Sequence, residues 1–166
     1  MHTALFYSFC LLFTNSIDMQ SSVEHLRHNY PLATKEAEIC EAQIKYIEAS
    51  ESSSPLEMAY QGAYHMLWAK YLTDPLHKLN SFKKGKKLME KAIKQRPGEP
   101  EIRFLRLTIQ YHAPGILKYN KDISQDLALL LKNWDGIPES TFKENMKDFL
   151  VTTELLDSTQ RKKLEI

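Results

Sequence analysis

The sequence predicts an all-α fold of antiparallel helix pairs, and three observations support this prediction. Apolar residues recur at three- and four-residue intervals through most of the chain, which is the spacing of one face of an α-helix. The chain has only 5 glycines, and hairpin turns of the Asn-Gly or Asp-Gly type are absent apart from Asp135-Gly136. Capping residues, several of them followed by proline, begin the periodic segments. We expect about seven or eight helices around one core, in a single domain of residues 17–166.

An uncharged apolar run at residues 4–13 precedes this domain. It is too short to span a membrane but has the length of a signal-peptide core. We therefore interpret residues 1–16 as a signal peptide and expect an exported protein, periplasmic or extracellular; a retained anchor or a buried first helix are the alternatives. Cys10 does not fit a lipoprotein site, because a large residue stands before it. Cys40 would then remain alone, and we expect it to be a buried apolar residue without a disulfide.

Two helices are predicted at the start of the domain. For the first, the capping pattern at residues 21–24 predicts a helix over about 21–29 that ends before Pro31. A second helix, apolar on one side and acidic on the other, follows Thr34 and reaches about Glu48.

Ser54, Pro55 and Glu57 combine an N-cap, a proline at the first helical position and a glutamate at the third. They predict a helix to about Leu72, with alanines and tyrosines over much of its circumference. We expect this helix to be central, and we favour core packing of its aromatic stripe over a ligand groove. Gly62 predicts the close approach of a neighbouring helix.

The next capping signal, Asp74-Pro75, predicts a short segment followed by an amphipathic helix over about 82–96. Pro100 begins a mostly buried helix to about Tyr111. Further along the chain, three more helices are predicted. The first follows a capping box at 122–125 and ends at Gly136. The second covers about 138–156, and the third is a short helix capped by residues 157–160.

Small residues in the middle of the chain resemble the signature of tetratricopeptide-type repeats. The matching positions are Gly62 in the first helix and Gly85, Met89, Ala92 and Pro97 in the second. The sequence departs from the signature at Gln61 and His65, and its interhelix connection is longer, so the resemblance covers one and a half irregular repeats over residues 55–134. It implies a right-handed helical array that acts as a partner-binding scaffold. Residues 101–106, with 113–114 and 119–120, also resemble an uncharacterised group of small exported bacterial helical proteins, a group that implies no activity.

No motif in the sequence predicts catalysis. The chain has no Gly-x-Ser-x-Gly, His-Glu-x-x-His, phosphate loop or Cys-x-x-Cys. His25 and His28 have a spacing that suits a metal, but no third ligand matches their register, so we favour two surface histidines. We expect no catalytic residues, no bound metal and no cofactor.

The charges are balanced overall but not locally. The chain has 22 Lys and Arg against 21 Asp and Glu, so no global field favours nucleic acid, and we expect no nucleic-acid partner. Residues 81–96, in contrast, carry seven cationic side chains and one carboxylate, Glu90, a net charge of +6. The candidate basic patch comprises Lys83, Lys84, Lys86, Lys87, Lys91 and Lys94. We favour a solvated face; the functional alternative is that this helix, over Lys83 to Arg96, binds anionic lipid headgroups or an acidic partner.

Arg103, Arg106 and Gln110 form a narrow polar strip on the mostly buried helix. Buried arginines need acidic partners, so our first interpretation is pairing with a neighbouring helix. The second is that these three residues line a concave groove that binds an unidentified protein or peptide. The leading functional hypothesis is an exported, non-catalytic helical scaffold of this kind, and the basic helix supplies the alternative.

Overall fold

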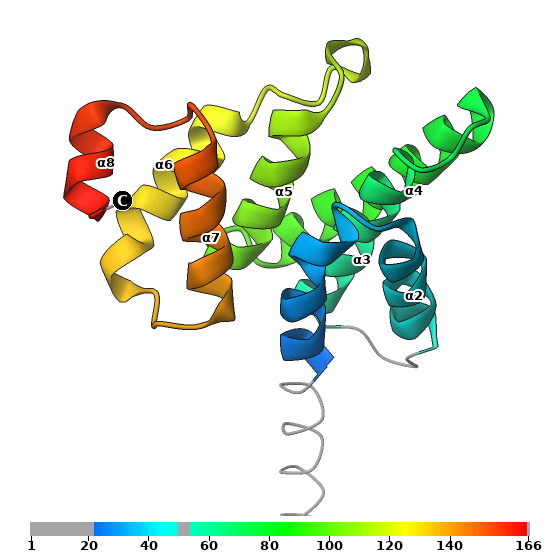
Figure 1. The fold of residues 1–166 in the computed structure, drawn as a ribbon, viewed down its shortest axis with the longest axis horizontal. Coiled ribbons are helices and arrows are strands. Elements are labelled where there is room, and N and C mark those ends of the chain that lie inside the picture. Colours follow the sequence, from blue (N-terminus) through cyan, green and yellow to red (C-terminus); the bar gives the residue numbers. More distant parts are fainter. Residues whose placement is uncertain (1–21, 50–53, 166) are drawn as a thin grey trace, which may run out of the picture.

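The computed structural model describes residues 22–49 and 54–165, without the side chain of Lys163, and in these residues every regular element is a helix (Figure 1). The predicted all-α class, with about eight helices, is confirmed. The predicted signal peptide, Cys10 and the cap at Ser21 lie outside the described residues. The elements are a helix over residues 22–33, α2 (Ala37–Glu48), α3 (Pro55–Trp68), α4 (Pro75–Gln95), α5 (Pro100–His112), η1 (Gly115–Leu117), α6 (Ile123–Asn133), η2 (Trp134–Gly136), α7 (Thr141–Thr152) and α8 (Ser158–Leu164).

Helix starts agree with the predicted caps where the cap is local. The Ser54 hydroxyl accepts from the Glu57 N–H at 3.2 Å, and the Glu57 carboxylate accepts from the Ser54 N–H at 2.8 Å. A second reciprocal box joins Asp157 and Gln160 at the start of α8. The predicted box at Asp122 is wrong, since its side chain makes no cap hydrogen bond. Its carboxylate lies 3.4 Å from the Arg106 guanidinium instead.

The first described helix does not end before Pro31, as predicted, but continues to residue 33. Proline lacks the N–H that would bond to the carbonyl four residues earlier, here that of Arg27. The side-chain amide of Asn145, on α7, donates to this carbonyl at 3.0 Å. A distant residue therefore replaces the bond that proline removes.

The α4 helix begins earlier than predicted. It is one continuous helix of 21 residues, not a short segment followed by a helix. The Asp74 carboxylate accepts from the N–H groups of Leu76 and His77, so the helix is capped at its first turn, and after Pro75 at its first position it meets no glycine or proline until Gly85. Several predicted boundaries also shift: α3 ends at Trp68, and α7 is confined to Thr141–Thr152.

The helices α3 and α4 cross at two glycines, which confirms the close approach predicted at Gly62. A Cβ atom on Gly62 would lie 2.8 Å from the carbonyl oxygen of Gly85, and one on Gly85 would collide with the carbonyl of Gly62. The two backbones are therefore in direct contact, which only residues without a Cβ atom permit.

Two apolar clusters form the interior, and α5 contributes to both. Residues 101–110 of α5 are all buried. Its Leu105 packs into a first cluster with helix 22–33, α2, α3 and α4, and its Leu107 packs into a second cluster with α6, α7 and α8. The α3 tyrosines lie in the first cluster, so the predicted core packing of the aromatic stripe is confirmed. Cys40 is buried there too, and burial raises the pKa of its thiol to about 12.

Helix 22–33 lies against α3, α5 and α7, and so bonds to helices far apart in the sequence. Figure 1 shows it beside α3. Its Arg27 forms two hydrogen bonds of 2.7 Å with Glu101 on α5. Its Leu26 carbonyl accepts from the Tyr64 hydroxyl on α3 at 2.8 Å. On α7, Thr141 bonds to Glu24. Helix 22–33 therefore occupies part of the surface of each of these three helices.

Candidate functional site

The exposed face of α4 carries two leucines in its first turns and a row of lysines after them. Lys83, Lys87 and Lys94 are exposed and are separated by four and seven residues, a spacing that returns to the same side of a helix. The opposite side of α4 is buried against α3 and the loop after α5. This buried side consists of Phe82, Gly85, Met89, Ala92 and Ile93. We call the row of Lys83, Lys87, Lys91 and Lys94 the lysine row.

No described carboxylate forms an ion pair with the lysine row. The other two lysines of the predicted patch are engaged: Lys84 Nζ lies 2.7 Å from the Glu48 carboxylate, and Lys86 Nζ lies 4.9 Å from the centroid of the Tyr119 ring. Glu90, the acid of this helix, accepts from the Tyr119 hydroxyl at 2.8 Å and lies 3.2 Å from Arg106. Its charge is therefore directed to the buried network and does not compensate the lysine row.

The N-terminal end of α4 projects from the rest of the molecule (Figure 1). Residues 73–80 are all exposed, and among them Leu76 is 64% and Leu79 37% exposed. Leu76 precedes Lys83 by seven residues, so it lies on the same side of the helix as the lysine row. The face therefore joins an apolar end to a cationic stripe.

The three residues of the second candidate site lie in the interior. Arg103 and Arg106, both buried, converge on Asp126 of α6, which is 0% exposed. Arg103 Nη1 lies 2.8 Å from its carboxylate, and two nitrogens of Arg106 lie 2.7 Å from it. Gln110 is buried beside them and donates to Asp122 at 3.4 Å. This arrangement agrees with internal pairing, the first of the two interpretations, and not with an open groove.

Burial works against the charged form of Arg106, but the hydrogen bonds and negative charge of Asp126 outweigh it, so the pKa of Arg106 is raised. Asp126 is not among the site residues predicted from the sequence. One signal was present: Asp126 lies three residues after Ile123 and four before Leu130, which places a carboxylate on the apolar face of a predicted helix. Binding of a partner by Arg103, Arg106 and Gln110 stays a prediction.

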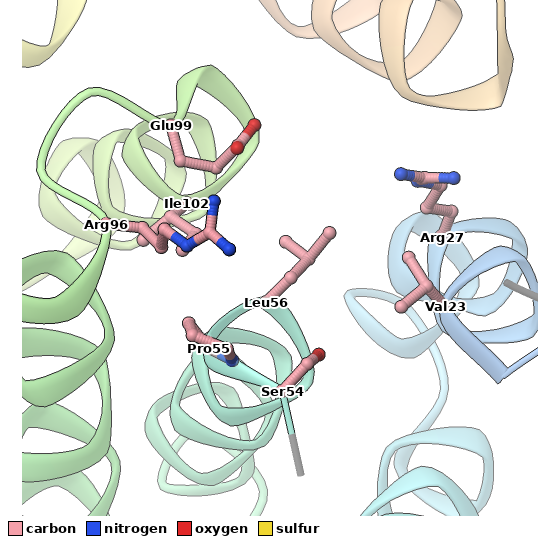
Figure 2. Close-up of a pocket in the computed structure, with 8 residues that line it drawn as sticks. All are labelled: Val23, Arg27, Ser54, Pro55, Leu56, Arg96, Glu99 and Ile102. Atoms are coloured by element: carbon pink, nitrogen blue, oxygen red, sulfur yellow. The ribbon is translucent and has the colours of Figure 1, made fainter. Parts of the chain in front are cut away.

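A shallow pocket of about 200 Å³ lies between helix 22–33, the start of α3 and the turn between α4 and α5 (Figure 2). Arg27 and Arg96 stand on opposite sides of it, with Leu56 between them. Arg27 is occupied by Glu101 and Glu24, which leaves Arg96 as the cation without an ion pair to a described residue. The pocket contains neither Arg103 nor Arg106, so it is not the groove expected beside them.

The two candidate metal ligands lie on the surface. His25 and His28 are both exposed on helix 22–33, as predicted. Within residues 22–49 and 54–165, no three His, Cys, Asp or Glu side chains are grouped so that they would hold a metal ion. In the same residues, no helix has the length and hydropathy needed to cross a membrane.

Comparison with known proteins found no matching family model, no similar curated protein and no similar solved structure. The tetratricopeptide-like resemblance therefore stays a prediction.

Proposed function

We propose that this protein is a non-catalytic helical module that attaches to an anionic surface through α4. The observation that carries the proposal is the exposed lysine row, four ammonium groups without an ion pair to any described carboxylate. These lysines lie within about 17 Å along one helix, since each residue advances the helix by about 1.5 Å. Neighbouring lysines are therefore about 4.5 to 6 Å apart along the helix axis, less than the Debye length of about 8 Å at physiological salt, so their fields reinforce one another.

The other predicted binding surface is less suited to a partner. Arg103 and Arg106 already share a buried carboxylate, and exposing them would separate charges that are stabilised only as a group. Helix 22–33 already bonds to α3, α5 and α7, so part of the surface that these helices could offer to a peptide is occupied by the chain itself. We therefore favour the anionic-surface alternative over a peptide groove. We retain the exported location as part of the proposal, on the basis of the apolar run at residues 4–13.

The test is binding of the full chain to fluorescent poly-L-glutamate, measured by anisotropy at low and high salt. The wild type is expected to bind, and more weakly as salt rises. The variant Lys83→Glu/Lys87→Glu/Lys94→Glu is expected to bind at least about tenfold more weakly. A matched control, Lys35→Glu/Lys132→Glu/Lys162→Glu, reverses three exposed lysines elsewhere and gives the same net charge. Equal loss in both variants would mean that net charge alone drives binding, and would overturn the role of α4.

A further inference from the structure

The lysine row and the two exposed leucines of α4 point to one kind of anionic surface. We propose that α4 docks on a lipid bilayer that contains anionic lipids, with Leu76 and Leu79 among the headgroups and the lysine row on the phosphates. This inference rests on the proposed function and names its partner. Exposed leucines beside lysines are the composition of helices that bind at a bilayer interface. A purely electrostatic contact would not need the leucines.

The shape of this face also suits a bilayer. From Leu76 to Lys94 it extends along one continuous helix for about 27 Å. A helix surface is convex, and the pocket described above is lined by residues outside this row. A plane of headgroups reaches every side chain of a convex, linear row, and lysine stems extend to place their ammonium groups at the phosphates.

The projecting end of α4 can be partly buried in the headgroup layer without leaving its first N–H groups unpaired. Its first free N–H groups, those of Leu76 and His77, already donate to the Asp74 carboxylate at 2.9 and 3.1 Å. Insertion at headgroup depth therefore leaves these donors satisfied. Because residues 73–80 are exposed, no packing within the protein must be broken before the two leucines meet the lipid.

The experiment is sedimentation of the full chain with two kinds of vesicle, phosphatidylcholine alone and an equal mixture of phosphatidylcholine and phosphatidylserine. Vesicles of phosphatidylcholine alone report any contribution of the apolar run at residues 4–13. Binding is expected to be much stronger to the anionic vesicles. Because each lysine near an anionic bilayer strengthens binding about fivefold, reversal of Lys83, Lys87 and Lys94 to Glu is expected to weaken it by about a hundredfold or more.

A variant of the two leucines distinguishes a bilayer from other anionic surfaces. Leu76→Gln/Leu79→Gln is expected to weaken binding to the anionic vesicles about tenfold while binding to poly-L-glutamate stays unchanged. The matched control is Leu32→Gln/Val151→Gln, since these side chains are 37% and 51% exposed on other helices. Circular dichroism checks that each variant is folded.

Three results would overturn the inference. Binding to poly-L-glutamate without binding to phosphatidylserine vesicles would exclude the bilayer and leave the proposed function intact, with an acidic protein as the partner. Vesicle binding unaffected by the leucine variant would exclude insertion of the α4 end. If the protein binds neither poly-L-glutamate nor anionic vesicles, the proposed function is overturned as well.

Discussion

At the scale of single residues, Asp126 organises the buried charges between α5 and α6. It is 0% exposed and accepts hydrogen bonds from both Arg103 and Arg106. Removal of Asp126 would leave Arg103 without an ionic partner among the described residues, and Arg106 with only Glu90 and Asp122, at 3.2 and 3.4 Å. Breaking a buried ionic group in this way costs more than the group contributed as a whole.

We expect Asp126→Asn to lower the free energy of unfolding by about 3 kcal/mol or more, because two buried guanidiniums lose their shared negative charge. Urea denaturation followed by circular dichroism measures this change. Asp148→Asn, at an exposed position of α7, is the control and is expected to change stability by less than about 0.5 kcal/mol. A loss below about 1 kcal/mol in Asp126→Asn would contradict the assignment of the charge to Asp126.

His65 makes stability depend on pH. Its pKa is lowered by burial and by the positive charge of Lys84, against the opposing effect of Glu48. Since the folded state binds this proton less readily than the unfolded state, the stability that neutral His65 contributes is present above the ordinary pKa of about 6.5 and is lost as the pH falls below it.

We therefore expect the urea midpoint to fall between pH 7.5 and pH 5.5, and to fall less in His65→Gln than in the wild type. His25→Gln, at an exposed histidine, should keep the wild-type dependence. The same fall in all three proteins would assign the pH dependence to other groups.

The sequence points to the cations of both candidate sites but not to the individual residues that pair with them. The lysines of α4 stand out because they are close together in the chain. Whether each is free or engaged depends on Glu48, 36 residues before Lys84, and on the Tyr119 ring. Local patterns contain no information about such pairings, which arise only when helices pack.

At the scale of helices, the difference between local signals and contacts made on packing explains which boundaries were predicted correctly. The starts of α3 and α8 depend on side chains three residues apart, so the sequence shows them directly. The continuation of helix 22–33 through Pro31 depends on Asn145, a residue 118 positions from Arg27.

A double-mutant cycle tests this explanation. Asn145→Ala is expected to lower the free energy of unfolding by about 1 kcal/mol, because the Arg27 carbonyl loses its donor. In a Pro31→Ala background the restored N–H supplies that bond, so Asn145→Ala is expected to cost clearly less. Equal costs in the two backgrounds, measured by urea denaturation, would show that Asn145 does not compensate for the proline.

At the scale of the whole molecule, α5 joins the two apolar clusters into one unit. Leu105 belongs to the first cluster and Leu107 to the second, and the two side chains leave the same turn of the helix. If α5 detached from one cluster, it would also leave the other and expose apolar surface there. We therefore expect a single cooperative unfolding transition.

The two tryptophans report the clusters separately, since Trp68 packs against the first and Trp134 lies in the second. Urea unfolding of Trp68→Phe, followed by the fluorescence of Trp134, is expected to coincide with the circular dichroism of the same variant. Trp134→Phe, followed by Trp68, should behave likewise. Midpoints that differ between the probes within one variant would show that the clusters unfold independently.

The link between helix 22–33 and α7 also has a consequence for synthesis of the chain. The bonded residues Glu24 and Thr141 are 117 positions apart, so the ribosome makes this helix long before it makes α7. Until then α3 and α5 can hold the helix, but the Arg27 carbonyl beneath Pro31 has no donor. Closing a loop of this length carries a large entropic cost. Helix 22–33 therefore gains its last tertiary bonds only after α7 has been made.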